Sequence, residues 1–375
     1  MKILLTGGGS GGHFYPIIAV AQSINDEVRK NHLVEPKLFY IAPEPYNKGL
    51  LFDNKITFKR NPAGKFRRYF SLMNLFDIFK TGIGVIKAVW TVFLIYPDVV
   101  FGKGGYGSFP ALLAAKILRI PVIIHESDST PGKTNIWAGK FARRVAVSYQ
   151  EAASYFPKEK VAYTGNPIRK EVKNIKTEGA KEFLKLEEGI PTILILGGSL
   201  GSQKINDIVV EALPKFVEQF QIIHQTGKKN YSEIVGRSNA ILFRNENRNR
   251  YHPFDYLNNI ALKMATSEAD LIISRAGSTI FEIAYWGKPS IIIPISDSNG
   301  NHQAKNSFAY SRSGAAVVID EKNLSDSMLY SQSVEILNNE EKRKKMSEAA
   351  KGFAKEDASE VIAKEIIKIA LEHEK

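Results

Sequence analysis

The sequence predicts an α/β protein of two domains, each built on a parallel β-sheet covered by helices on both faces. Short apolar runs rich in β-branched residues alternate with amphipathic helical patterns along the chain, which is typical of parallel sheets. A strand, a glycine turn and a helix occur twice, as KILLTGGGSGG near residue 7 and TILILGGSLGS near residue 197. A chain of 375 residues is long enough for two such domains.

The expected strands fall into two groups, one in each half of the chain. They are Lys2–Leu5, Leu38–Ile41, Asp98–Phe101, Val122–His125 and Val145–Ser148, and then Thr192–Leu196, Gln221–Gln225, Leu271–Ser274 and Ser290–Ile295. Amphipathic helical patterns lie between them, for example at Tyr15–Ile24 and Ala111–Leu118.

The expected domains span residues 1–166 and 167–355, because glycine, asparagine and proline cluster in Thr164–Lys170. The charged segment Glu171–Gly189 that follows has a helical pattern. A last helix is expected at Ser359–Leu371, where apolar residues recur at helical spacing, and the segment 356–375 is expected to pack back on the first domain.

The composition is that of a globular protein with a basic surface. Lysine and arginine number 51 against 39 acidic residues, a net charge of +12, which favours nucleic acid, phosphorylated metabolites or an anionic membrane leaflet as partners. A lysine-rich surface also serves solubility alone. The absence of cysteine excludes disulfides and thiolate metal sites. No carboxylate cluster that would hold a metal is evident, so no metal or other cofactor is expected.

No segment of the sequence is expected to cross a membrane. The apolar start of the chain is too short for the core of a signal peptide. The most apolar stretch, Ile83–Tyr96, is shorter than a spanning helix and contains Lys87.

The first glycine loop, Gly7–Gly12, fits G-x-G-x-x-G directly after a strand. Glycines let backbone N–H groups approach a phosphate, and the following helix adds its positive end. A nicotinamide dinucleotide site would need an acidic residue about 20 residues further on, and Glu44 lies too far away. His13 follows the loop directly and suits a general base, although a packing role at the helix start is the alternative.

Two more glycine loops follow expected strands. Gly197–Gln203 contains Ser199 and Gln203, and Gly102–Ser108 contains Tyr106. Ligands of open α/β sheets bind at the carboxyl ends of strands, so these loops are expected to line a site.

Three polar segments lie at other strand ends. In Arg275–Glu282, the spacing of Thr279 and Glu282 fits a helix-capping box, but Glu282 also suits ribose hydroxyls, with Ser278 beside it. The amide-rich segment Asn299–Asn306, which includes Gln303, suits sugar hydroxyls or an ordinary turn. His125–Asp128, which includes Glu126, is either a site wall or a buried polar pair.

A candidate membrane contact lies in Gly64–Lys80 (GKFRRYFSLMNLFDIFK). Basic residues are mixed there with phenylalanine, tyrosine and leucine, a composition suited to the interface of an anionic leaflet. A helix packed on its own domain with a basic rim is the alternative.

Together the motifs resemble those of the MurG family. They are, in order, GGGSGGHFYP, FGKGGYGSFP, HESDSTPGKTN, TGNPIR, GGSLGSQ, HQTG, SRAGSTIFEIAYWGKPSIIIP and NHQAKN, from residue 7 to residue 306. The resemblance implies the GT-B fold, with two Rossmann-like domains facing across a cleft. It implies an inverting transferase that moves N-acetylglucosamine from UDP-N-acetylglucosamine to the 4-hydroxyl of the muramoyl sugar of lipid I, making lipid II for peptidoglycan.

The resemblance also implies the residues of the site. His13 would be catalytic, and contacts to donor or acceptor carry over onto Ser10, Gly11, Gly12, Asp128, Arg169, Ser199, Glu282 and Gln303. Additional candidates are Tyr106, Glu126, Gln203, Ser278, Thr279 and Asn306. Two departures stand out: HESD replaces the family's HEQN, so Asp128 stands for an asparagine, and RAGSTIFE is one residue shorter than the usual form.

The resemblance further implies a peripheral protein at the cytoplasmic face of the cell membrane, with lipid I on the N-terminal domain and the nucleotide sugar on the C-terminal domain. Association with other cell-wall enzymes is a further expectation, and nucleic acid is not an expected partner. The alternatives are a GT-B transferase with another lipid acceptor such as diacylglycerol, a UDP-N-acetylglucosamine 2-epimerase, and a nucleotide-sugar sensor without turnover.

Overall fold

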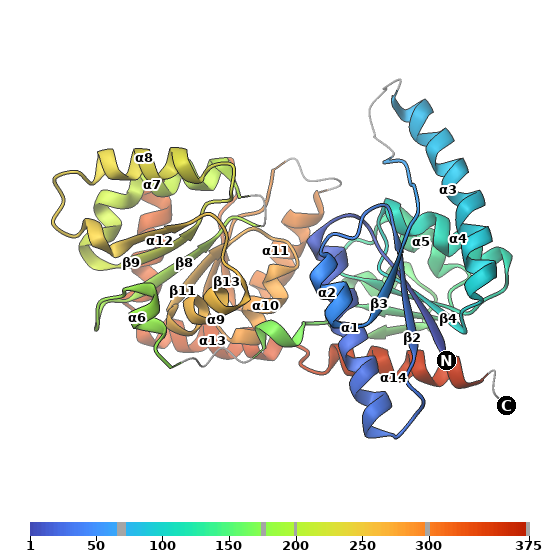
Figure 1. Cartoon of the computed structure of the whole chain (residues 1–375). Coiled ribbons are helices and arrows are strands. Elements are labelled where there is room, and N and C mark those ends of the chain that lie inside the picture. Colours follow the sequence, from blue (N-terminus) through green and yellow to red (C-terminus); the bar gives the residue numbers. More distant parts are fainter. Residues whose placement is uncertain (66–72, 174–177, 199–200, 297–300, 373–375) are drawn as a thin grey trace. The chain divides into compact units, whose positions relative to one another are not determined.

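The computed structural model describes residues 1–65, 73–173, 178–198, 201–296 and 301–372 (Figure 1). The chain divides into two compact units. The N-terminal unit is Met1–Lys170 together with Lys355–Lys375, and the C-terminal unit is Glu171–Ala354. Each unit is built on one parallel sheet with helices against it (Figure 1).

The sheet of the N-terminal unit, within the described residues, has seven parallel strands in the order β3-β2-β1-β4-β5-β6-β7. The strands are β1 (Lys2–Thr6), β2 (Lys37–Ala42), β3 (Ile56–Arg60), β4 (Val99–Gly102), β5 (Val122–Glu126), β6 (Arg144–Val147) and β7 (Val161–Tyr163). Leu4 of β1 is paired with Phe39 on one side and Val100 on the other. The strand order reverses between β1 and β4, so their carboxyl ends form the switch point where ligands of such sheets bind.

The helices of the N-terminal unit lie between successive strands, except α14, which follows the C-terminal unit. They are α1 (Gly11–Lys30), α2 (Lys48–Asp53), α3 (Met73–Ile95), α4 (Phe109–Ile117), α5 (Lys133–Gly139) and α14 (Ala358–Leu371). Short 3-10 turns are η1 (Tyr106–Ser108), η2 (Gln150–Tyr155) and η3 (Lys170–Val172), the last at the junction of the units.

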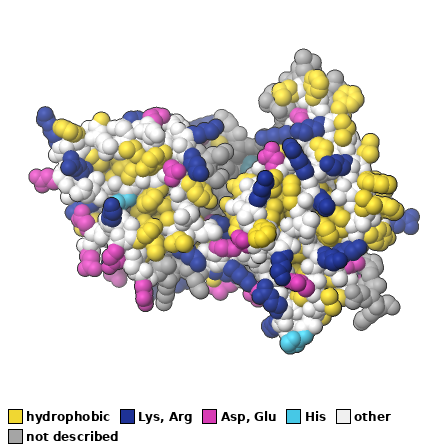
Figure 2. All heavy atoms as spheres, in the orientation of Figure 1, with side chains coloured by type: hydrophobic (Ala, Val, Ile, Leu, Met, Phe, Trp, Pro, Cys, Tyr) yellow, Lys and Arg dark blue, Asp and Glu magenta, His cyan; other side chains and the backbone are white. Residues whose placement is uncertain are grey.

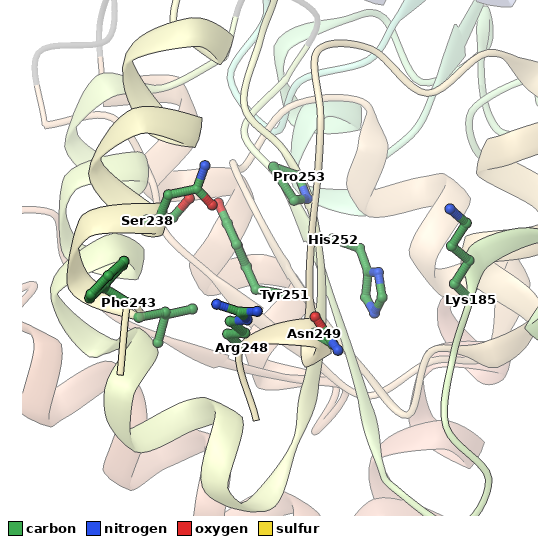
Figure 3. Close-up of a pocket in the computed structure, with 10 residues that line it drawn as sticks. Lys185, Ser238, Phe243, Arg248, Asn249, Tyr251, His252 and Pro253 are labelled. Carbon is green, nitrogen blue, oxygen red and sulfur yellow. The ribbon is translucent and has the colours of Figure 1, made fainter. Parts of the chain in front are cut away.

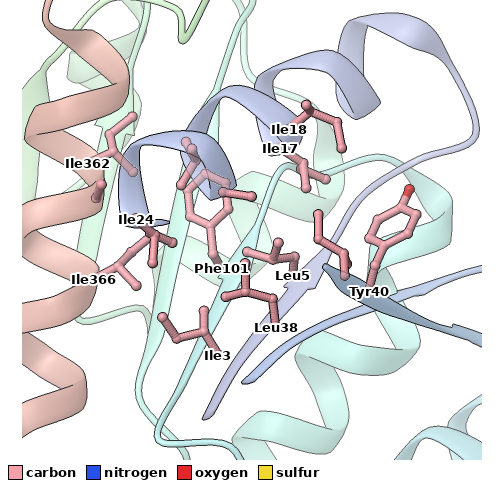
Figure 4. Close-up of a cluster of buried hydrophobic side chains, with 14 of the residues drawn as sticks. Ile3, Leu5, Ile17, Ile18, Ile24, Leu38, Tyr40, Phe101, Ile362 and Ile366 are labelled. Atoms are coloured by element: carbon pink, nitrogen blue, oxygen red, sulfur yellow. The ribbon is translucent and has the colours of Figure 1, made fainter. Parts of the chain in front are cut away.

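The last helix completes the core of the first unit (Figure 4). Ile362 and Ile366 of α14 are buried and face Ile24 of α1, as Figure 4 shows. Ile3 and Leu38, from β1 and β2, belong to the same cluster of buried side chains. The apolar residues of α14 recur at helical spacing, so one face is buried while the other meets water. A segment from the end of the chain thus finishes a core that begins at residue 3.

The sheet of the C-terminal unit, as far as it is described, has six parallel strands in the order β10-β9-β8-β11-β12-β13. The strands are β8 (Thr192–Leu196), β9 (Gln221–Gln225), β10 (Tyr251–Phe254), β11 (Leu271–Ser274), β12 (Ser290–Ile292) and β13 (Ala316–Val318). Ile195 of β8 pairs with His224 of β9 and Ile273 of β11. The order reverses between β8 and β11, which places a second switch point at the ends of these strands.

The helices of the C-terminal unit cover this sheet. They are α6 (Ala180–Leu184), α7 (Gln203–Gln219), α8 (Tyr231–Ile241), α9 (Asn259–Glu268), α10 (Thr279–Trp286), α11 (His302–Arg312), α12 (Asp326–Leu337) and α13 (Glu340–Phe353), with a 3-10 turn η4 (Arg248–Arg250). Phe216 of α7 and Leu329 of α12 are fully buried in the core of this unit.

Helix α3 corrects one expectation. The apolar stretch Ile83–Tyr96 forms, as far as Ile95, the second half of a helix of 23 residues, because the apolar pattern continues back through Phe76. Phe76–Ile95 has a mean hydropathy of 1.7 and is, by length and composition, long enough to cross a membrane. One side of this helix nevertheless packs on its own unit, since Ala88 and Val92 are fully buried. Only 22% of the window is buried in this way.

Two other expectations about elements were wrong. Ser290–Ile295 is a strand only to Ile292, just before Pro294, which has no amide hydrogen to donate. Glu171–Gly189 is not one helix: among its described residues, the α-helix is limited to α6, which lies between Gly179 and Lys185, both in the left-handed conformation.

Candidate active site

In the N-terminal unit, the loops that follow β1 and β4 cross at the switch point. Gly8 follows β1 and Gly105 follows β4, and a Cβ on Gly105 would lie 2.9 Å from the Cα of Gly8. Gly105 also has φ of +78°, which residues with side chains rarely adopt. Glycine is therefore required at this crossing, which brings the first and third glycine loops together.

The imidazole of His13 is held at this crossing. Helix α1 begins at Gly11, so His13 lies in its first turn and its backbone N–H donates to the carbonyl of Ser10 at 3.1 Å. The hydroxyl of Ser10 lies 2.7 Å from Nδ1 of the imidazole. Nε2 faces the other loop, where a Cβ on Gly105 would lie 3.2 Å from it. One turn therefore carries Ser10, Gly11, Gly12 and His13, with the half-buried ring oriented by Ser10.

Tyr106 closes the same crossing from the β4 side. A Cβ on Gly9 would lie 3.2 Å from the hydroxyl of Tyr106. Burial raises the pKa of Tyr106, and the charges of Glu44 and Asp77 raise it further. The hydroxyl therefore stays protonated at neutral pH and is able to donate a hydrogen bond beside the first loop.

Glu126 stabilises the loop after β5 through hydrogen bonds. Its Oε1 accepts a hydrogen bond from the backbone N–H of Asp128 at 2.9 Å. Its Oε2 accepts from the backbone N–H of Gly132 at 3.0 Å and from the side-chain amide of Asn135 at 2.9 Å. Since both oxygens are engaged and the residue is buried, Glu126 shapes the loop that presents the half-buried Asp128.

A buried lysine lies near these two carboxylates. Lys103 is 1% exposed, and within the described residues its Nζ has no hydrogen-bond partner. Burial lowers the pKa of Lys103 to about 8, while the charges of Glu126 and Asp128 oppose this change. Burial and the charge of Asp128 raise the pKa of Glu126. Burial likewise lowers the pKa of His125, whose Nε2 lies 3.0 Å from the carbonyl oxygen of Gly165.

Arg169 lies beside the first turn of α1. Its guanidinium carbon is 4.0 Å from the centroid of the Tyr15 ring, a cation–π contact. The ring of Tyr15 in turn lies against Gly11, where a Cβ would be 3.2 Å from it. Arg169 is 6% exposed, so this contact fixes a buried cation near the turn that carries His13.

In the C-terminal unit, the loop after β8 opens the second switch point. Gly198 and Gly201 have φ of +90° and +77°, and a Cβ on Gly201 would lie 2.1 Å from the carbonyl oxygen of Thr226. Both glycines are therefore required by the backbone. Ser202 begins α7 as its N-cap and accepts from the backbone N–H of Ile205 at 3.4 Å. Ser199 lies outside the described residues, and Gln203 contacts Asp207 on its own helix at 3.0 Å.

Arg275, just after β11, joins three segments at this switch point. Its guanidinium donates to the hydroxyl of Ser202 and to Oε1 of Glu321, both at 2.5 Å. Oε2 of Glu321 accepts from the backbone N–H of Ser296 at 3.1 Å. Burial acts to raise the pKa of Glu321, but its hydrogen bonds to Ser296 and Arg275 outweigh this and lower it. The arginine is therefore held by an ionised carboxylate.

Glu321 has no local signal in the sequence that marks it as a site residue. The residue follows β13 and is 46 positions from Arg275, so no local spacing links the two. Arg275 directly follows a predicted buried strand, and a buried arginine needs a carboxylate partner. That position is the one sequence signal that would have prompted a search for Glu321.

The capping-box interpretation of α10 was wrong. The N-cap is Ser278 and its side chain makes no capping hydrogen bond, while Thr279 is the first helical residue. Glu282 is half-buried in the first turn of α10, where a carboxylate is favoured by the helix dipole. Ser278, Thr279 and Glu282 thus share the start of the helix that follows Arg275.

Gln303 and Asn306 lie on α11, which begins at His302 inside the predicted amide-rich segment Asn299–Asn306. The turn interpretation was therefore wrong for residues 302–306, which are helical. Oε1 of Gln303 accepts a hydrogen bond from the backbone N–H of Ile295 at 3.1 Å, which ties the helix to the end of β12. Asn306 is 2% exposed and lies one turn further on. Asn301 begins α11 with φ of +53°. The start of α11 is thereby tied to the segment that follows β12.

A cavity of about 620 Å³ in the C-terminal unit does not coincide with these residues (Figure 3). Figure 3 shows that Tyr251 and His252 of the edge strand β10 line it, with Arg248 and Ser238 nearby. It lies on the far edge of the sheet from β11 and contains none of the predicted site residues. Within the described residues, no three histidine or acidic side chains are grouped to hold a metal ion.

Comparison with known families matches both halves of the chain. Residues 3–147 match the N-terminal domain of glycosyltransferase family 28, and residues 192–362 match its C-terminal domain. A curated relative from Oenococcus oeni is named UDP-N-acetylglucosamine–N-acetylmuramyl-(pentapeptide) pyrophosphoryl-undecaprenol N-acetylglucosamine transferase. It is 37% identical over 98% of this chain and 97% of its own length.

Solved structures share the architecture. The crystal structure of Acinetobacter baumannii MurG has a TM-score of 0.73 and 25% identity, covering 98% of this chain and 99% of that one. A UDP-N-acetylglucosamine 2-epimerase from Neisseria meningitidis, bound to UDP-N-acetylglucosamine, has a TM-score of 0.67 at 16% identity, with 98% and 100% of the two chains covered. The second likeness shows the fold alone.

The two matched domains, the full-length relatives and the glycine loops at both switch points lead to one assignment. The chain belongs to glycosyltransferase family 28, and within it to the MurG family of UDP-N-acetylglucosamine-dependent N-acetylglucosaminyltransferases with a GT-B fold.

Proposed function

We propose that this chain transfers N-acetylglucosamine from UDP-N-acetylglucosamine to the 4-hydroxyl of the muramoyl sugar of lipid I, with inversion at the anomeric carbon, to give lipid II. The observation that carries the proposal is the imidazole of His13, held 2.7 Å from the hydroxyl of Ser10 at the switch point of the first sheet. The relatives that share its full length are named for this transfer.

The reaction is a single in-line displacement. The acceptor O4 forms a bond to the anomeric carbon while the bond from that carbon to UDP breaks, and UDP leaves with one more negative charge. His13 either takes the proton of O4 as a general base or orients that hydroxyl. Ser10 orients the ring through Nδ1, and in this proposal Nε2, which faces the Gly105 loop, contacts the acceptor hydroxyl. The displacement needs no nucleophile from the enzyme and, in this proposal, no metal.

The C-terminal unit stabilises the departing diphosphate. Arg275 supplies a cation that its contacts with Ser202 and Glu321 hold in place, between the loop after β8 and the start of α10. A charge fixed before the reaction stabilises developing negative charge without reorganisation. Glu282 accepts hydrogen bonds from ribose hydroxyls, and Gln303 contacts sugar hydroxyls. In the N-terminal unit, Arg169 helps to balance the diphosphate charge.

The protein is peripheral at the cytoplasmic face of the cell membrane, and α3 supplies the contact. Six large apolar side chains are 63–75% exposed and recur at helical spacing along one side: Phe76, Phe79, Ile83, Ile86, Trp90 and Leu94. Figure 2 shows hydrophobic side chains gathered where this helix runs. Lys80 and Lys87 of the same helix suit an anionic leaflet. A face this apolar is unusual on a surface that meets only water.

The decisive assay measures UDP release from the purified protein. Release is expected only when UDP-N-acetylglucosamine and lipid I are both present, with lipid II as the second product. Release with diacylglycerol in place of lipid I would assign another acceptor. Conversion of the nucleotide sugar without any acceptor would assign an epimerase or hydrolase, and absence of any turnover would leave a sensor.

A further inference from the structure

A small cavity lies beside Tyr106 in the N-terminal unit. Its volume is about 300 Å³, at the lower end for ligand sites. Asp77, Ile78 and Thr81 from the first turns of α3 line one part, and Tyr106, Phe109, Thr134 and Gly64 line the rest. A site of this size holds a segment of a larger molecule, not the whole of a lipid-linked sugar.

The lining favours hydrocarbon over phosphate. The hydroxyl of Thr81 is already engaged, since it donates to the carbonyl of Asp77 at 2.7 Å and accepts from the N–H of Gly64 at 3.0 Å. Phe109 and Ile78 supply apolar surface. Among the described residues that line the cavity there is no lysine or arginine to bind a phosphate. An uncharged, apolar segment suits this cavity.

The cavity is preformed by two close contacts between backbones. A Cβ on Gly64 would lie 2.1 Å from the carbonyl oxygen of Asp77, and a Cβ on Gly84 would lie 1.9 Å from the carbonyl oxygen of Pro62. The side-chain amide of Asn61 also donates to the carbonyl of Gly84 at 3.0 Å. The loop before residue 65 is therefore fixed against α3 at two points, which holds the wall of the cavity in place.

The position of the cavity links two surfaces of the unit. Tyr106 borders the cavity and also faces Gly9 of the first glycine loop, where a phosphate group is expected. Helix α3 borders the cavity with Ile78 and exposes its apolar side to the surroundings. A molecule with a diphosphate at the loop and an apolar chain along α3 would pass through this cavity.

We propose that this cavity binds the first isoprenoid units of the acceptor's polyprenyl chain, next to the diphosphate. The proposal rests on the proposed function, whose acceptor is a polyprenyl diphosphate. The cavity then selects the acceptor by the branched, unsaturated start of its lipid, separately from any contact of α3 with a bilayer.

The test uses full-length protein in detergent solution, without vesicles, so that membrane binding does not contribute. Three acceptors carry the same sugar, peptide and diphosphate: one with two isoprenoid units, one with a straight saturated chain of equal carbon number, and one with a methyl group. Wild type is expected to show the lowest KM for the prenyl acceptor. Ile78→Trp, which fills the cavity, is expected to raise that KM about 10-fold and to leave the KM for UDP-N-acetylglucosamine unchanged.

The matched control is Ile117→Trp, at an exposed isoleucine of α4 in the same unit, which is expected to leave the prenyl KM unchanged. Ile78→Ala, which removes part of the lining, is expected to raise that KM by a smaller factor and guards against misfolding of the tryptophan variant. Equal KM values for the three acceptors, or an unchanged prenyl KM in both Ile78 variants, would overturn the proposal. Absence of turnover in wild type with every acceptor would instead reject the proposed function.

Discussion

The hydroxyl of Ser10 and the imidazole of His13 are joined across the first turn of α1, with 2.7 Å between Oγ and Nδ1. The contact engages Nδ1, while Nε2 faces the loop that contains Gly105. A turn that serves only to bend the chain would not need an oriented imidazole.

Replacing His13 is expected to remove most of the turnover. His13→Ala should lower kcat by about 10²–10⁴-fold, the range for loss of a positioned base, with UDP affinity unchanged by calorimetry. Ser10→Ala should cause a smaller loss, because the ring is retained but less well oriented. His32→Asn, a change at an exposed histidine on the opposite end of α1, is the control. Near-normal turnover of His13→Ala would remove His13 from the mechanism.

Weakening the Arg275 contact is expected to weaken donor binding. Arg275→Lys keeps the charge but cannot reproduce the paired contacts with Ser202 and Glu321, so UDP affinity should fall about 10-fold. Glu321→Gln should have a similar but weaker effect, since the carboxylate that holds the guanidinium in position is replaced by a neutral amide. Arg237→Lys, at an exposed ion pair with Asp207, should bind UDP like wild type. Unchanged UDP affinity in Arg275→Lys would place the diphosphate elsewhere.

Contact with anionic membranes is expected to depend on the exposed side of α3. Ile86→Glu should reduce sedimentation with vesicles that contain anionic lipid, because a carboxylate replaces an apolar group that is 74% exposed. The remaining binding should fall as salt is added. Phe183→Glu, at an exposed apolar residue of the C-terminal unit, is the control. Equal vesicle binding by both variants would argue against α3 as the membrane contact.

The buried Lys103 is expected to make stability depend on pH in the alkaline range. Its pKa is lowered from 10.5 to about 8 in the folded protein, so the unfolded chain binds more protons between these values and the stability contributed by this group rises with pH. Lys103→Met should therefore be more stable than wild type at pH 7, by roughly 3 kcal/mol. The advantage should shrink between pH 8 and 10.5. Chemical denaturation of both proteins across this pH range measures the difference in their free energies of unfolding. A difference that does not change with pH would contradict a lowered pKa of Lys103.

The last helix is expected to stabilise the first unit. Ile366 is fully buried between α14 and the N-terminal core, so Ile366→Ala should lower the free energy of unfolding by about 2–5 kcal/mol. Val361→Ala, at a position of the same helix that is 42% exposed, should change it much less. Thermal denaturation followed by circular dichroism distinguishes the two. Equal losses would mean that helix propensity, not burial, determines the effect.

The central strands were predictable and the edge strands were not. The bounds of β8, β9 and β11 are those expected. All three strands are buried, and β8 and β11 give apolar runs of four and three residues. The four strands that the analysis missed, β3, β7, β10 and β13, are the outer strands of the two sheets. In β3, Lys59 and Arg60 are exposed, so the segment lacks an apolar run.

Some residues of the candidate site could be predicted from the sequence and others could not. The loops that contain His13 and Gly105 follow β1 and β4, so their place at strand ends was predictable, while the role of His13 stays a prediction. The partner of Arg275 was not predictable, because Glu321 comes from a distant loop and only the tertiary fold brings them together. The roles of Glu282, Gln303 and Asp128 stay predictions.

The return of α14 to the first unit reverses the order in which the chain can fold during synthesis. Residues 171–354 leave the ribosome as a complete unit, whereas the unit that begins at Met1 lacks Ile362 and Ile366 until the segment after residue 354 emerges. The N-terminal unit is therefore synthesised first but completes its core after the C-terminal unit. A fragment that stops at residue 170 has an uncovered strip along α1, a surface open to chaperones and to aggregation.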